Sequence, residues 1–133
     1  MKTQNNAVEV VKEYFNSLAK GDFQKLGSIL ADDIVWHQPG NGALSKTYSG
    51  KSEVFALFGR FMEISQGTFK IDQVDSIMAN GDLVAATLHF SAKNKNGAIA
   101  MNGVDLMRVT NGKIKEVFLF SADQKAEDSF WIA

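Results

Sequence analysis

The chain has 133 residues and no cysteine, which excludes disulfides, thiolate catalysis, zinc ribbons and cysteine-bound iron–sulfur clusters. Its net charge is −1 and only two of its residues are arginine, so it lacks the basic surface of a nucleic-acid-binding protein. The length fits one domain, which we place over residues 1–133 with a core over about 7–123. The polar N-terminus and the absence of a long apolar run predict a cytoplasmic protein with no membrane segment.

Near the N-terminus, apolar residues recur three and four positions apart, which is the spacing of one face of a helix. The pattern predicts an amphipathic helix over 7–20. Asn5 or Asn6 can cap its start, because a short side-chain oxygen accepts a hydrogen bond from the first turn. Gly21 ends it, since glycine readily adopts the left-handed conformation that often follows a helix.

The next segment predicts a second helix, a short strand and a third helix. Asp22 can cap the second helix, and Asp32–Asp33 end it. A strand over 34–38 precedes a turn-rich loop, and Ser49 can cap the third helix over 51–64. The predicted apolar face of the second helix holds Phe23, Leu26, Ile29 and Leu30. That of the third helix holds Val54, Phe55, Phe58, Phe61 and Met62.

The Asn-Gly pairs at 80–81, 96–97 and 111–112 divide the second half of the chain into segments rich in Val, Ile, Thr and Phe. Asn-Gly tolerates positive φ at both central positions of a tight turn, so it is a strong signal for a β-hairpin. We therefore predict four antiparallel strands over about 68–79, 83–94, 98–110 and 113–123. Helices followed by an antiparallel sheet predict an α+β fold, with the helices on one face of a curved sheet. The apolar tail over 124–133 is expected to dock on the domain or on a partner subunit.

Few sequence motifs point to a particular chemistry. The two histidines are 52 positions apart and belong to no metal-ligand pattern, so no metal site is predicted. No glycine-rich phosphate-binding loop and no Gly-x-Ser-x-Gly nucleophile motif is present. The sequence therefore predicts no cofactor, and any chemistry must come from carboxyl, phenol and imidazole groups.

Asp105 stands out in the strand predicted over 98–110. Side chains alternate between the two faces of a strand, and the other residues on its face are Ile99, Met101, Gly103, Met107 and Val109. A carboxyl group among apolar side chains is desolvated, which raises its pKa, and perturbed carboxyl groups are enriched at functional sites. Two alternatives are that Asp105 pairs with a buried polar group for structure, or that a bulge at Gly103 turns it outward.

The same alternation separates the two histidines from the apolar faces. His89 lies on the more polar face of its strand and is expected at the surface or in a subunit interface. Trp36 and Gln38 share one face of the first strand, and His37 lies on the other. Pro39 and the glycines after it leave room for the strand end to rotate His37 inward.

A set of short motifs spans nearly the whole chain: Gly21-Asp22, Ala31-Asp32-Asp33, Trp36 with Pro39, Tyr48-Ser49-Gly50-Lys51, and Asn111-Gly112-Lys113-Ile114. In this order they resemble the SnoaL-like domains of the nuclear transport factor 2-like superfamily. That superfamily also contains ketosteroid isomerases, polyketide cyclases, scytalone dehydratase and limonene epoxide hydrolase. The resemblance implies a cone, in which a strongly curved antiparallel sheet wraps around the N-terminal helices and leaves a mostly apolar pocket at the open end. It also implies a homodimer formed through the outer face of the sheet.

The ketosteroid isomerases allow a comparison of single residues. Tyr14 resembles the tyrosine of their oxyanion hole, and Asp105 resembles the protonated aspartate beside it. Gln38, just before Pro39, stands where those enzymes have a general-base aspartate, and a glutamine cannot accept a proton. His37 next to it is the candidate base in this chain.

Three functions are compatible with these residues. The first is an enzyme acting on a small, mostly apolar carbonyl or hydroxy compound, as an isomerase, cyclase, dehydratase or hydrolase. Asp105 and Tyr14 would then donate hydrogen bonds, and His37 would act as the base. The second is a non-catalytic module that binds such a compound, and the third is a dimerisation domain whose pocket is filled. The expected pocket lining is Trp36, Gln38, Phe55, Phe58, Leu88, Met101 and Met107.

Overall fold

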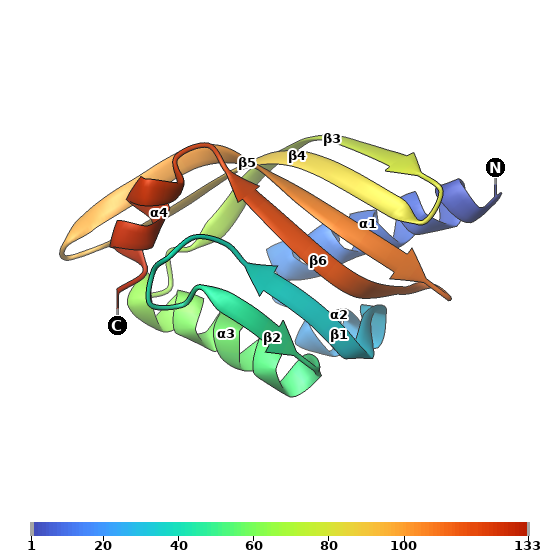
Figure 1. Cartoon of the computed structure of the whole chain (residues 1–133), viewed down its shortest axis with the longest axis horizontal. Coiled ribbons are helices and arrows are strands. Elements are labelled where there is room, and N and C mark those ends of the chain that lie inside the picture. The colour runs from blue at the N-terminus through green and yellow to red at the C-terminus, as the bar shows by residue number, and fades with distance from the viewer. Residues whose placement is uncertain (1, 133) are drawn as a thin grey trace.

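The computed structural model describes residues 2–132, which form a curved, unclosed sheet of six strands with four helices (Figure 1). The helices are α1 (Lys2–Lys20), α2 (Phe23–Ile29), α3 (Lys51–Ile64) and α4 (Gln124–Phe130). The strands are β1 (Leu30–Gln38), β2 (Lys46–Ser49), β3 (Lys70–Asn80), β4 (Leu83–Asn94), β5 (Gly97–Thr110) and β6 (Lys113–Ser121). The predicted α+β fold with a curved sheet is confirmed.

The strands follow the order β2-β1-β6-β5-β4-β3 across the sheet. Neighbouring strands are antiparallel except β1 and β6, which run parallel. The predicted four-stranded meander is confirmed as β3 to β6. The prediction missed β2, an edge strand of four residues, because none of its side chains is fully buried and its sequence shows no apolar alternation.

The Asn-Gly pairs at 80–81, 96–97 and 111–112 lie at hairpin turns, but only one of them has the predicted geometry. A further pair, Asn102-Gly103, lies inside β5. Asn111 and Gly112 occupy both central positions of their turn, with φ of 52° and 77°. The other two hairpins close through Gly81–Asp82 and Lys95–Asn96. Their Asn-Gly pairs are therefore displaced by one residue from the centre of the turn, in opposite directions.

Helix α1 begins at Lys2, earlier than predicted. Asn5 and Asn6 consequently lie inside the helix, and the prediction that one of them caps it is wrong. Gly21 follows the helix with a φ of +67°, as its sequence position indicated. The helix contacts β3, β4 and β5, so one of its faces is covered by the sheet (Figure 1).

Helix α2 is short and joins directly to the sheet. Asp22 caps it, as predicted, by accepting a hydrogen bond of 3.1 Å from the backbone N–H of Lys25. Phe23, predicted on the buried face, is 59% exposed, because a helix of two turns buries only its later residues. The chain enters β1 at Leu30, so Asp32–Asp33 lie within the strand and do not end the helix.

Helix α3 has the predicted bounds of 51–64 but not the predicted cap. Its N-cap residue is Gly50, and Ser49 instead donates its backbone N–H to Oε1 of Glu53 at 2.9 Å. Met62, predicted on the apolar face, is exposed. The side chains that the helix buries fully are Val54, Leu57 and Phe61.

Helix α4 lies at the end of the molecule away from the N-terminus (Figure 1). Phe130 and Trp131 at its end are buried against the rest of the chain, whereas Ile132 is exposed. Within residues 2–132, no helix is long and apolar enough to cross a membrane. The cytoplasmic location and the homodimer stay predictions.

Candidate functional site

The sheet and the helices α1, α3 and α4 enclose a cavity of about 70 Å³, which we call the inner cavity. Its lining consists of Tyr14, Leu18, Trp36, Gln38, Phe58, Phe61, Phe69, Ile71, Leu88, Phe90, Gly103, Asp105, Leu119, Phe120, Ser121, Glu127 and Trp131. Most of this lining is aromatic or aliphatic, as expected for a small-molecule site. Phe120 is 56% exposed, so the inner cavity approaches the surface beside it.

The alternation of side chains along the strands decides which of them reach the inner cavity. Each of four strands contributes residues two positions apart: Trp36 and Gln38, Leu88 and Phe90, Gly103 and Asp105, and Leu119 and Ser121. A glycine is required at position 103, because a Cβ there would lie 2.7 Å from the backbone oxygen of Phe120.

Asp105 lines the inner cavity and keeps a small accessible surface. In the described part of the chain its carboxyl group has no hydrogen-bond partner, so the structural pairing considered above is not present. The register between β4 and β5 is continuous past Gly103, so no bulge turns Asp105 outward. Burial, and then the nearby charge of Glu127, raise the pKa of Asp105 to about 7.

Tyr14 projects from α1 into the same cavity and is almost fully buried. Burial, and then the charge of Asp105, raise the pKa of its hydroxyl well above the usual value for tyrosine. Among the side chains that the structure describes, over 6–132, this hydroxyl has no partner, although every fully enclosed polar side-chain atom there has one. The free oxygen atoms of Tyr14 and Asp105 therefore border the open space of the inner cavity.

Gln38 supplies a further polar group to this wall. Its side-chain oxygen accepts a hydrogen bond of 3.0 Å from Nε1 of Trp36, and this contact orients both side chains. The amide nitrogen of Gln38 has no hydrogen-bond partner among the described residues. The inner cavity is thus bordered by three groups that can donate a hydrogen bond: the Tyr14 hydroxyl, the protonated Asp105 carboxyl and the Gln38 amide.

Glu127 in α4 also lines the inner cavity, and the sequence reasoning missed it. Its carboxylate accepts hydrogen bonds from Ser121 Oγ at 2.6 Å, Gln124 Nε2 at 3.1 Å and Trp131 Nε1 at 3.0 Å. The available signal was the spacing of Glu127 and Trp131, which four residues apart lie on one side of a helix. The tail was expected to dock through its apolar side chains, and its buried carboxylate was overlooked.

His37 does not reach the inner cavity. It lies on the other face of β1, where Nε2 is 2.7 Å from Oε2 of Glu116 and Nδ1 is 3.2 Å from Oγ1 of Thr47. Its ring stacks on Phe118 with 4.5 Å between the ring centres. The inward rotation that a base in the pocket would need is absent, so the structure separates His37 from Tyr14 and Asp105.

The expected ligand-contacting residues divide into two groups. Trp36, Gln38, Phe58 and Leu88 line the inner cavity, whereas Phe55, Met101 and Met107 do not. Met101 and Met107 belong to the surrounding hydrophobic core, and Phe55 packs against Phe58 with 5.9 Å between the ring centres. The aromatic residues that the prediction missed are Phe61, Phe69, Phe90, Phe120 and Trp131.

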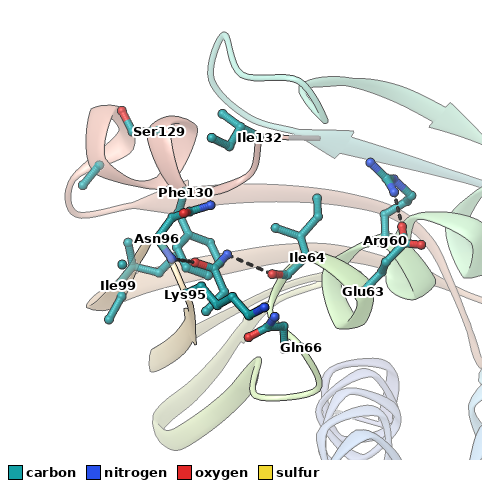
Figure 2. Close-up of a pocket in the computed structure, with 14 residues that line it drawn as sticks. Arg60, Glu63, Ile64, Gln66, Lys95, Asn96, Ile99, Ser129, Phe130 and Ile132 are labelled. Atoms are coloured by element: carbon teal, nitrogen blue, oxygen red, sulfur yellow. Dashed lines mark hydrogen bonds and ion pairs between the residues drawn. The ribbon is translucent and has the colours of Figure 1, made fainter.

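A second depression, which we call the outer groove, lies between the end of α3, the β4–β5 hairpin and α4 (Figure 2). It has a volume of about 630 Å³ and shares no lining residue with the inner cavity. Some of its polar groups bind within the groove: Arg60 pairs with Glu63, and Nδ2 of Asn94 donates to the backbone oxygen of Ile64 at 2.9 Å. Tyr14 and Gln38, which keep unpaired polar groups in the inner cavity, are buried, so the inner cavity is the candidate site.

Comparisons with known proteins agree with this fold. The sequence pattern of the SnoaL-like domain matches residues 11–117. An uncharacterized protein of Mycobacterium tuberculosis is 26% identical over 129 residues, which cover 97% of this chain and 98% of that protein. A crystal structure from Xanthomonas campestris, of a protein of unknown function with a cystatin-like fold, is 46% identical with a TM-score of 0.92. That match covers 96% of this chain and 98% of the other.

More distant structures share the fold alone. A putative ketosteroid isomerase from Kribbella flavida is 19% identical, with a TM-score of 0.71 and coverage of 90% of this chain and 80% of that one. An LEH-like epoxide hydrolase of M. tuberculosis is 20% identical, with a TM-score of 0.70 and coverage of 96% and 88%. The match over most of the chain and the agreement of the fold show that this chain belongs to the SnoaL-like domain family.

Proposed function

We propose that the inner cavity binds a small, mostly apolar compound through a carbonyl or hydroxyl oxygen and promotes acid/base chemistry at that oxygen. The observation that carries this proposal is the pair of unpartnered oxygens of Tyr14 and Asp105 in an apolar cavity. Both groups are protonated below about pH 7, because their pKa values are raised. Two donors in a mostly apolar site stabilise negative charge that develops on a substrate oxygen.

The volume of the inner cavity limits the ligand. One water takes up about 30 Å³ of the liquid, so 70 Å³ holds about two waters or a compound of a few heavy atoms. A larger ligand requires a side chain at the wall to move.

A second candidate is binding without chemistry. Gln38 favours it, because an amide cannot take a proton and instead adds a third donor for a ligand oxygen. Both candidates need the same contacts, so the first experiment tests binding, and proton exchange then separates a binder from an enzyme.

The binding test uses acetone and cyclopentanone as probes, with the protein observed by NMR at pH 6. We expect saturable shifts at Tyr14 and Asp105, and affinity at least about tenfold weaker in Tyr14→Phe and in Asp105→Asn. Tyr48→Phe is the matched control, because the Tyr48 hydroxyl donates to the backbone oxygen of Leu44 away from the inner cavity. Unchanged affinity in both site variants, or no saturable shift in the wild type, would contradict the proposal.

A further inference from the structure

We infer that Glu127 of α4 is the proton acceptor of the inner cavity and that Asp105 is its proton donor. The inference rests on the proposed function and adds a base to it, because His37 of β1 does not reach the inner cavity. The base is contributed by the C-terminal helix, which docks on the sheet after β6.

The polar lining of the inner cavity leaves few groups that can accept a proton. Its polar members are Tyr14, Gln38, Asp105, Ser121 and Glu127. At pH 6 the hydroxyl of Tyr14 and the carboxyl of Asp105 carry their protons, since that pH lies below both pKa values. Gln38 does not titrate, and the hydroxyl of Ser121 donates to Glu127. Glu127 is therefore the remaining acceptor among the described lining residues.

The contacts of Glu127 suit a carboxylate anion held in one orientation. Three donors point at its two oxygens, from Ser121, Gln124 and Trp131. A buried charge requires such partners, since it is costly to remove from water without them. A carboxylate has about four acceptor positions, so the three bonds leave one for a substrate proton. The ring of Trp131 is itself packed 4.8 Å from that of Phe61, which fixes the direction of its N–H.

The two carboxyl groups of the inner cavity thus have different surroundings. Asp105 has no hydrogen-bond donor in the described chain, whereas Glu127 has three. Paired carboxyl groups in unequal surroundings divide the roles of acid and base between them. The negative charge of Glu127 also disfavours a second negative charge at Asp105.

The reaction that follows is proton removal from a carbon next to a carbonyl group. Glu127 takes the proton, and the electron pair of the broken C–H bond forms a carbon–carbon double bond. The π electrons of the carbonyl group move to its oxygen, which receives the proton of Asp105 or its hydrogen bond. Reversal of these steps returns both protons, so no oxidant, reductant or further reactant is consumed. In D₂O the same cycle replaces the carbon-bound proton by deuterium.

Proton exchange of acetone and cyclopentanone in D₂O, followed by NMR at pH 6 where Asp105 is protonated, tests this assignment. We expect wild-type exchange above the buffer rate and a loss of about 100-fold or more in Glu127→Gln, whose side chain keeps its shape. Glu116→Gln is the matched control and should exchange like the wild type, because Glu116 pairs with His37 on the opposite face of the sheet. The binding of both probes is measured in parallel in every variant.

The outcomes separate this inference from the proposed function. Probe binding with exchange lost in Glu127→Gln but kept in Glu116→Gln supports both. Probe binding without wild-type exchange, or with equal exchange in Glu127→Gln, overturns the role of Glu127 and leaves the binding proposal standing. Absence of probe binding overturns the proposed function and this inference with it. If Glu127→Gln does not fold, Glu127→Asp takes its place and should bind the probes normally but exchange their protons at least about tenfold more slowly. Exchange by Glu127→Asp at the rate of the wild type refutes the inference.

Discussion

The substitution Asp105→Asn removes the one titratable aspartate that lines the inner cavity while keeping its size and shape. In the wild type, the folded protein holds the Asp105 proton up to about pH 7, whereas the unfolded chain releases it near its ordinary value of 3.8. A carboxyl group with a raised pKa in the folded state contributes stability at low pH, and this contribution disappears as the pH rises through about 7. The asparagine is neutral throughout, so the variant has no such loss.

The size of the effect follows from the pKa of Asp105. At pH 5 the unfolded chain has already lost the Asp105 proton, whereas the folded protein keeps it until about pH 7. The folded and unfolded states therefore differ by one proton over about two pH units, from 5 to 7. Each unit corresponds to about 1.4 kcal/mol, so the wild type should lose about 3 kcal/mol of unfolding free energy relative to the variant. The other titrating groups are common to both proteins and cancel in the difference.

The assay is urea denaturation of both proteins at pH 5, 6, 7 and 8. We expect the wild type minus variant difference to fall steadily up to pH 7 and then to level off. Asp75→Asn is the control, because it makes the same chemical change at an exposed position of β3. A difference that does not change with pH would refute the reasoning that Asp105 is held neutral by its surroundings.

Three further predictions concern stability and are also measured by urea denaturation. Gly103→Ala should destabilise the folded protein by about 1–3 kcal/mol, because its Cβ would meet the backbone of β6. Gly59→Ala, at an open position of α3, should stabilise it by about 0.5–1 kcal/mol. Equal effects of the two substitutions would contradict the close approach of Gly103 to β6. Trp131→Ala should cost about 3–5 kcal/mol, since it removes a buried ring and a donor to the α4 carboxylate, and a cost below about 1 kcal/mol would show that α4 is not docked. Asp22→Ala should cost about 1 kcal/mol as the loss of a helix cap, and Ser49→Ala should cost less than half of that, because its side chain caps nothing.

Local periodicity was sufficient to predict the fold class and the direction of several site residues. The alternation along a strand is a property of the backbone, so it placed Asp105 inward and Trp36 with Gln38 on one face without knowledge of the neighbouring strands. The same alternation placed His37 on the outer face of β1, and the structure shows it there, paired with Glu116. The inward rotation that would make His37 a base in the cavity does not occur.

The sequence pattern did not predict which side chains reach the inner cavity, because that depends on contacts between elements far apart in the chain. Met101 and Asp105 share one face of β5, but four residues of strand separate them by roughly 13 Å, and a small cavity reaches only part of that length. The depth of a side chain along its strand depends on which helices cover it. Glu127 was missed for a related reason, because its position beside Asp105 exists only once α4 has docked on the sheet.

A ¹³C NMR titration of the Asp105 carboxyl carbon measures most directly whether the inner cavity holds a neutral proton donor. The structure predicts a midpoint at about pH 7 in the wild type and a lower midpoint in Glu127→Gln, since the substitution removes one of the two causes that raise it. A wild-type midpoint at about pH 4, the range of an ordinary aspartate, would contradict the proposed site.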